Sequence, residues 1–297
     1  MDLFAEAGAS LEPLAGGWSG ETFLADVRGE RSVVRILAAP RHPPQAAEVL
    51  AALHRLVRGL VPVPEVREAR RPDADAGTPG LLVTEFLPGV RGDLLLPGLD
   101  EDGLRRVGAA TGGIAATLAG MPTLRPGAWA DADLRIDPFH LVLSDWVDAH
   151  AARLTGWTPP ELDGLARVAN TAQDVLDGVD RTCVVHSDLN AKNLLVDPET
   201  LGVTGVLDWE YSHSGHPATD LGNLLRFDRA PAYVDAVLGA WSDRHGTTAA
   251  EALDLARSAD LFALVDLAAR AGAHPVADAA HDLLRAIART GDVHALA

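Results

Sequence analysis

Residues 184–197 read VVHSDLNAKNLLVD, a polar segment enclosed by two apolar runs. The apolar runs at 184–185 and 194–196 are typical of short buried strands. The segment between them carries hydrogen-bonding and ionisable groups, among them His186, Asp188 and Asn193. We expect the strands to anchor the loop rigidly and the polar side chains to perform chemistry.

The chain continues into a predicted strand at 203–207, which ends at Asp208-Trp209-Glu210. The strands on either side of the intervening turn would bring Asn193 and Asp208 together, and their amide and carboxylate oxygens are the hard ligands that Mg²⁺ takes. Asp188 would lie on a loop, where its carboxylate could accept a hydroxyl proton. Phosphoryl transfer needs such a base, a metal site and phosphate neutralisation. Each residue alone has a structural alternative, namely a turn or a cap.

The segment HSDLNAKN at 186–193 resembles the His-x-Asp-x-x-x-x-Asn catalytic loop of the protein-kinase-like superfamily. The resemblance is closer to the aminoglycoside phosphotransferase family, because LDWEYSHSGHPATDLGNLL at 207–225 is similar to that family's metal segment and following helix. It implies an α+β, two-lobed kinase fold, and the composition shift near Pro88-Gly89 divides the chain into an antiparallel-sheet lobe at 1–88 and a mostly helical lobe at 89–297. It also implies transfer of phosphate from ATP or GTP, with Mg²⁺, to a small-molecule hydroxyl.

By position, the resemblance makes Asp188 the catalytic base and makes Asn193 and Asp208 the metal ligands. His186 would brace the loop, and Asp220 would bond to the loop backbone. Lys192, the one lysine in the sequence, lies four residues past Asp188 and would neutralise the transferred phosphoryl group. The alternative for Lys192 is a solvent-facing side chain.

The first third of the chain predicts strand, strand, helix, strand, strand. Alternation and turn residues predict paired strands within 11–37 and further strands at 61–68 and 81–87, and periodicity predicts a helix at 46–57. Helices are expected at 100–119, 140–155, 161–178 and from 219 onward, although the Gly112-Gly113 pair weakens the first of these.

Nucleotide-binding residues are expected in this first part. Kinase-like enzymes place a phosphate-binding lysine on the third strand. Here that position is Arg35, with Glu48 as its expected ion-pair partner. Ser19, in the glycine-rich segment GGWSG, would donate to phosphate. The backbone near Glu85 and Leu87 would meet the base.

The sequence leaves several classes of acceptor molecule open. A cationic, amine-bearing antibiotic such as an aminoglycoside is the first hypothesis, with Glu210 and Asp228 as the residues that bind it. Three further acidic residues are candidates: Asp131, Asp133 and Asp137. A metabolic kinase of an amino alcohol or sugar is the alternative, and a non-catalytic nucleotide-binding pseudokinase is a second one.

Composition excludes several classes. The formal charge of −17 disfavours nucleic-acid partners. No apolar run approaches the roughly 20 residues of a membrane helix. The start has no signal-peptide pattern, so the expected location is cytoplasmic. No Walker or nucleophile-elbow motif occurs. A metal cluster of His213, His216 and Asp220 lacks a supporting frame, so polar loop residues are the expectation there.

Overall fold

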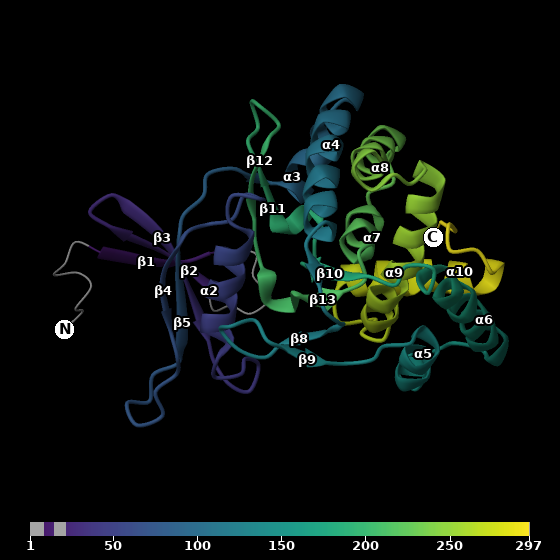
Figure 1. Cartoon of the computed structure of the whole chain (residues 1–297), viewed down its shortest axis with the longest axis horizontal. Coiled ribbons are helices and arrows are strands. Elements are labelled where there is room, and N and C mark those ends of the chain that lie inside the picture. Colours follow the sequence, from purple (N-terminus) through teal and green to yellow (C-terminus); the bar gives the residue numbers. More distant parts are fainter. Residues whose placement is uncertain (1–8, 15–21, 297) are drawn as a thin grey trace. The chain divides into compact units, whose positions relative to one another are not determined.

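The computed structural model describes residues 9–14 and 22–296, and the chain divides into two compact units. The first unit takes the described residues up to Pro97 together with Trp129–Asp137 and Ala191–Tyr211. The second takes Gly98–Ala128, Pro138–Asn190 and the chain from Ser212 onward. An antiparallel sheet dominates the first unit and helices dominate the second, so the predicted α+β class is confirmed (Figure 1).

The first unit is built on a five-stranded antiparallel sheet. Its strands, in sheet order, are β1 (Ala9–Pro13), β2 (Thr22–Val27), β3 (Glu30–Leu37), β5 (Gly80–Glu85) and β4 (Val66–Arg70). Strand β1 was not among the expected strands; its segment ASLEP is short and ends in proline, which has no N–H to donate. Helix α2 (Ala46–Val57) packs on β4 and β5 and buries Leu53 and Val57 completely.

The β2–β3 hairpin closes at the predicted turn. Arg28 and Gly29 both have positive φ, at 58° and 87°, which is the backbone of a two-residue hairpin turn. Asp26 reinforces the turn, because its Oδ1 accepts from the Gly29 N–H at 2.8 Å. This turn sets the register that places Arg35 opposite Thr22 on β2, and β5 places Leu82 on its other side.

A second, three-stranded sheet also belongs to the first unit. It runs β12 (Val203–Val206), β11 (Leu194–Val196), β6 (Val90–Arg91), followed by the short helices α3 (Gly92–Leu95) and η1 (Leu96–Gly98). The Val206 N–H also donates to the Pro62 carbonyl at 2.8 Å. Residues 191–211 therefore fold with the first unit, which differs from the expected division at residue 88, because β12 bonds to the backbone at Pro62.

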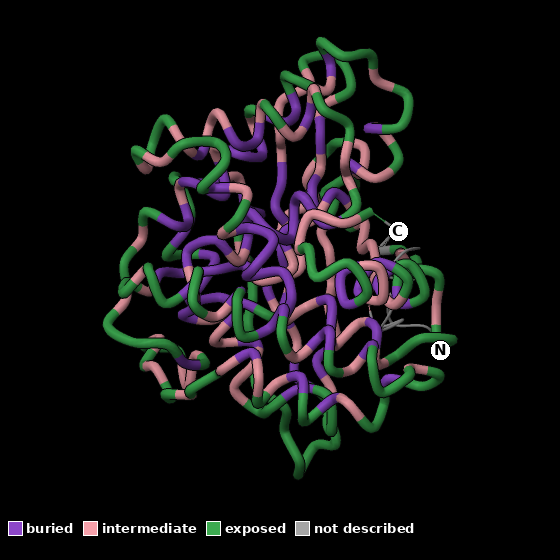
Figure 2. The backbone as a smooth tube through the Cα atoms, turned by 90° about the vertical axis from the view of Figure 1, so that its right-hand side faces the viewer, coloured by how far each residue is buried: buried purple, intermediate pink, exposed green. Residues whose placement is uncertain are grey.

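The second unit contains seven α-helices in its described residues. They are α4 (Glu101–Ala119), α5 (Leu143–Ala151), α6 (Pro159–Leu176), α7 (Thr219–Leu225), α8 (Pro231–His245), α9 (Ala249–Ala268) and α10 (Pro275–Thr290). In Figure 2 buried residues recur along the helices between exposed ones, the pattern of amphipathic helices packed by one face. The core between α6, α9 and α10 includes Leu165, Val265 and Leu284, all fully buried.

The glycine pair in α4 is compatible with a helix because of α8. A Cβ at Gly112 would lie 2.5 Å from the Val237 carbonyl oxygen, so glycine is what lets the two helix backbones approach. The helices α4 and α8 run against each other along their length. The glycine that weakened the helix prediction is therefore needed for α4 to pack against α8.

Short strands complete the second unit. They form the order β7 (Pro122–Thr123), β10 (Thr182–Val185), β13 (His213–Gly215), β8 (Gly127–Trp129). Most of β9 (Ile136–Pro138) lies in a segment of the first unit. β10 leads directly into the polar segment of the opening motif. Among the described residues, no helix combines the length and apolar character needed to cross a bilayer.

Candidate active site

The polar loop of residues 186–190 begins where β10 ends. Cys183, Val184 and Val185 of this strand are almost completely buried between β7 and β13. Ser187 follows with φ of 67°, a left-handed conformation that costs a non-glycine residue free energy. The surrounding structure must hold this conformation in place.

Asp220, on α7, supplies that hold. Its Oδ2 accepts from the His186 N–H at 2.9 Å, and its Oδ1 accepts from the Ser187 N–H at 2.8 Å. Asp220 was expected to bond to this backbone, and both of its oxygens do so. Burial raises the pKa of Asp220 to about 7, although the two backbone donors act in the opposite direction.

Asn223, one turn further along α7, extends this support. Its Oδ1 accepts from the Leu189 N–H at 3.3 Å, and its Nδ2 lies 3.4 Å from Oδ1 of Asp260 on α9. Asp260 also pairs with Arg226, with 2.6 Å between Oδ1 and Nη2, and both side chains are buried. Asn223 was not among the predicted site residues, although the spacing of three residues in DLGN places it on the same helix face as Asp220.

Asp188 is itself held in orientation. Its N–H donates to Nδ1 of the fully buried His186 at 3.2 Å, so a neutral His186 ring carries its proton on Nε2. The Asn190 side chain donates to Oδ1 of Asp188 at 2.7 Å and to its carbonyl oxygen at 3.2 Å. Asp188 remains partly exposed.

Asn193 and Asp208 lie in the first unit, at one end of the β11–β12 pair. Asn193 closes η2 (Ala191–Asn193) directly before β11, and Asp208 follows β12 and precedes η3 (Trp209–Tyr211). The Leu207 N–H donates to the Asn193 carbonyl at 2.8 Å, so the backbone brings the two segments together. Asn193 is 5% exposed, and Asp208 has φ of 65°. Their amide and carboxylate oxygens are suitable donors for Mg²⁺.

Arg35 reaches this segment from β3. Its Nη1 lies 2.6 Å from Oδ1 of Asp208, and its Nη2 donates to Oε2 of Glu210. Nη2 of Arg41 lies 3.1 Å from Oε1 of Glu210. The Arg35 and Glu210 side chains are only 15% and 10% exposed. Asp208 therefore meets an arginine from the sheet and lies beside a second carboxylate.

One expected pairing is corrected here. Glu48 does not pair with Arg35; it pairs with Arg71, at 2.6 Å between Oε2 and Nε, because α2 turns Glu48 toward the loop after β4. Both oxygens of Glu210, a residue proposed to bind the acceptor, accept from arginines in this structure. Its carboxylate is thus already engaged.

The other predicted residues lie on several elements. Ser19 and its glycine-rich segment lie outside the described residues. Lys192 is half-buried within η2. Glu85 ends β5, where its Oε1 accepts from the Glu65 N–H at 3.0 Å, and Leu87 follows it. Asp228 is half-buried between α7 and α8.

The model of the phosphotransferase enzyme family matches residues 10–255, most of the chain. The chain belongs to the phosphotransferase enzyme family. The match includes the loop around Asp188, the segment from Asn193 to Glu210 and the supporting helix α7. The resemblance inferred from HSDLNAKN is confirmed.

Solved structures share the fold of this phosphotransferase. Aminoglycoside phosphotransferase APH(4)-Ia aligns with a TM-score of 0.69 at 18% identity, over 98% of this chain and 97% of that one. A thermostable mutant of that enzyme, in ternary complex with ADP and hygromycin B, gives 0.66 and 20% over 97% of both chains. The GDP complex of aminoglycoside 2'-phosphotransferase-IIIa gives 0.67 and 16% over 95% and 93%. At such identities the likeness establishes the fold.

Curated relatives match this phosphotransferase in part. The Mus musculus protein acyl-CoA dehydrogenase family member 10 is 28% identical over 181 residues, 59% of this chain and 16% of that protein. Acyl-CoA dehydrogenase family member 11 of Mus musculus is 43% identical over 51 residues, 17% of this chain and 6% of that protein. The chain thus spans only a small fraction of the length of these relatives.

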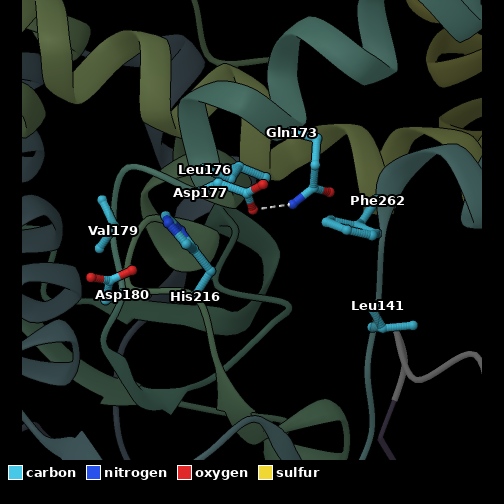
Figure 3. Close-up of a pocket in the computed structure, with 8 residues that line it drawn as sticks. All are labelled: Leu141, Gln173, Leu176, Asp177, Val179, Asp180, His216 and Phe262. Atoms are coloured by element: carbon cyan, nitrogen blue, oxygen red, sulfur yellow. Dashed lines mark hydrogen bonds between the residues drawn. The ribbon is translucent and has the colours of Figure 1, made fainter.

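A hollow in the second unit of the phosphotransferase has a volume of about 340 Å³. Figure 3 shows its lining, with Gln173 donating to Asp177 at 2.6 Å and the His216 ring beside Leu176 and Asp177. None of the residues predicted to catalyse or to bind nucleotide, metal or acceptor lines it. This hollow is therefore separate from the residues that the motif identifies.

His216 argues against the alternative metal cluster. Its Nδ1 accepts from the Ala218 N–H at 3.2 Å, and burial lowers the pKa of His216 to about 4. Asp220 is occupied by the loop backbone. Within residues 9–14 and 22–296, no group of three or more His, Cys, Asp and Glu could hold a metal ion.

Proposed function

We propose that this phosphotransferase transfers the γ-phosphate of ATP to a hydroxyl group of a small molecule, with Asp188 as the catalytic base. The observation that carries the proposal is the support of Asp188 and its loop. Asn190 orients the carboxylate, and Asp220 and Asn223 fix the backbone on either side of Asp188. Such preorganisation is what proton transfer from a weakly acidic hydroxyl requires.

The proposed transfer moves one proton, forms one bond and breaks one bond. Asp188 accepts the proton of the acceptor hydroxyl while the hydroxyl oxygen bonds to the γ-phosphorus. The bond between that phosphorus and the β,γ-bridging oxygen breaks, and ADP leaves with the electron pair. A magnesium ion, when bound by Asn193 and Asp208, would supply neutralisation of the phosphate charge. Their oxygen donors fit this metal.

Cationic side chains complete the proposed nucleotide site. Arg35 would hold the non-transferred phosphates, and its planar guanidinium can bind phosphate oxygens bidentately. Lys192 would neutralise the transferred group. Ser19 and the backbone near Glu85 and Leu87 are the proposed contacts to the phosphates and the base. GTP is the alternative donor, and the GDP complex of a fold neighbour supports testing it.

For the acceptor we propose an amine-bearing antibiotic such as an aminoglycoside. The hygromycin B complex of a fold neighbour and the net charge of −17 support a cationic acceptor. Asp228, near the end of α7, is the carboxylate that we assign to it. A metabolic kinase acting on an amino alcohol or sugar is the alternative, because the same chemistry serves either class.

A nucleotide-release screen tests these proposals. The purified full chain is offered ATP or GTP with Mg²⁺, in separate panels of aminoglycosides, amino alcohols and sugars, with Asp188→Asn as the control. Acceptor-dependent release that the variant lacks supports the kinase proposal, and the active panel identifies the class. Nucleotide binding without release in every panel favours the pseudokinase alternative.

A further inference from the structure

The carboxylate that orients Arg35 is displaced from its expected position in the chain. Glu48 on α2 was expected to hold Arg35, but it forms an exposed pair with Arg71. Glu210, two residues past the proposed metal ligand Asp208, takes the Nη2 side of the Arg35 guanidinium. Arg35 thus depends on η3 rather than on α2.

The surroundings of Glu210 are suited to fixing a guanidinium. Its side chain is 10% exposed, and each of its oxygens accepts from a different arginine. Nε2 of His42 lies 4.0 Å from Oε2. Bonds between arginine and carboxylate in a poorly hydrated setting are strong and directional. Arg41 therefore holds Glu210 while Glu210 holds Arg35.

The two ends of the Arg35 guanidinium contact different carboxylates. Nη1 of Arg35 contacts Asp208, a residue that we assign to the metal. Nη2 contacts Glu210, which follows Asp208 by two residues and is not assigned to the metal. Because Glu210 fixes one edge of the guanidinium, Arg35 would keep its orientation when the Asp208 carboxylate binds the metal.

We propose that Glu210 is the positioning residue for Arg35, orienting its guanidinium toward the nucleotide phosphates in the role expected of Glu48. The proposal rests on the proposed function, since it concerns the nucleotide site. Glu210 touches Arg35 and Arg41 and acts on the nucleotide only through Arg35. Replacing Glu210 would therefore weaken nucleotide binding with or without metal.

Calorimetric titration of ADP into the full chain, with and without Mg²⁺, tests this. We expect Glu210→Gln to weaken ADP binding about tenfold in both conditions, which corresponds to about 1.4 kcal/mol. Glu48→Gln is the competing arm, and Glu65→Gln, which removes an exposed pair with Arg58, is the matched control. Both should stay within about twofold of wild type.

A double-mutant cycle distinguishes a specific effect of Glu210 on Arg35 from a general destabilisation of the fold. In an Arg35→Ala background, Glu210→Gln should add little further loss, because the partner it positions is gone. In turnover, the KM for ATP should rise while the KM for the acceptor stays constant. Glu210→Asp keeps the charge and shortens the reach, so it should show the same loss and serves if Glu210→Gln does not fold.

Several results would overturn the proposal. ADP affinity unchanged in Glu210→Gln and Glu210→Asp is one, and loss confined to the Mg²⁺ condition, which would make Glu210 a metal ligand, is another. A rise in acceptor KM alone would return Glu210 to the acceptor site, and loss with Glu48→Gln alone would restore α2 as the support. If wild type binds neither ADP nor GDP, the proposed function fails first, a result distinct from all of these.

Discussion

Oδ2 of Asp220 on α7 accepts a hydrogen bond from the backbone N–H of His186, at 2.9 Å, across 34 residues of sequence. Its other oxygen takes the next N–H, from Ser187, at 2.8 Å. One buried carboxylate thus fixes two successive peptide groups directly before Asp188. The position of the proposed base depends on a helix that follows it far along the chain.

Replacing Asp188 by Asn should abolish turnover and spare nucleotide binding. Asn keeps the shape and can still accept from Asn190, but it cannot take a hydroxyl proton. We expect kcat to fall about 10²–10⁴-fold, the usual contribution of a general base. Steady-state ADP release and calorimetric ADP affinity measure the two effects. Retention of full turnover would refute the role of Asp188.

Replacing Asp220 by Ala should destabilise the second unit strongly. Two buried N–H groups would lose their acceptor, and each such loss costs about 1–3 kcal/mol. Asp197→Ala is the matched control, because Oδ1 of Asp197 also accepts from two N–H groups, those of Glu199 and Thr200, but in an exposed turn. There water replaces the lost acceptor, so the cost should be about 1 kcal/mol or less. Urea unfolding followed by circular dichroism compares them, and equal losses would contradict the assignment.

The stabilising effect of Asp220 should depend on pH. Burial raises its pKa to about 7, so the folded protein binds the proton more tightly than the unfolded chain, where the pKa is near 4. Stability from this group is therefore present at low pH and is lost as pH rises from about 4 to about 7. The unfolding free-energy difference between wild type and Asp220→Asn should shrink between about pH 5 and about pH 7.5. A difference that stays constant over that window would show that Asp220 ionises normally.

Gly222→Ala should separate α7 from α9. A Cβ at this position would lie 2.5 Å from the Ala256 carbonyl oxygen, so the helices must shift, at about 1–3 kcal/mol. Gly239→Ala on α8 is the matched control, since a methyl group there would have no neighbour within 4 Å, and Ala should stabilise that helix by about 0.5–1 kcal/mol. Thermal unfolding measures both, and slower turnover should accompany the first change only. Stabilisation by both would show that α7 tolerates movement.

Local sequence predicted the elements near the motif well. The apolar runs around residues 184–197 are strands β10 and β11, and the Arg28-Gly29 turn closes the expected hairpin. Helices α4, α5 and α6 lie within a few residues of the predicted ranges. Such features depend on periodicity and turn chemistry, which short segments carry by themselves.

Partner choice was the part that local sequence could not supply. The pairing of Arg35 with Glu48 was expected from element order and is wrong, because side-chain direction on α2 depends on how the helix packs. The assignment of residues 191–211 to the second lobe also differs from the structure, since the Val206 N–H on β12 donates to the Pro62 carbonyl within the first unit. Both outcomes rest on contacts between segments distant in sequence.

The amino-acid sequence by itself determined the family chemistry: a carboxylate, an amide and a second carboxylate at fixed spacing between apolar runs, because spacing and polarity are properties of the chain alone. Tertiary structure decided which side chains bond to the catalytic-loop backbone and to Arg35. Asp220 and Asn223 reach the loop, and Glu210 reaches Arg35, only because helices and strands pack those segments within hydrogen-bond distance. Burial then sets the strength of these contacts, and burial is a property of the packed fold.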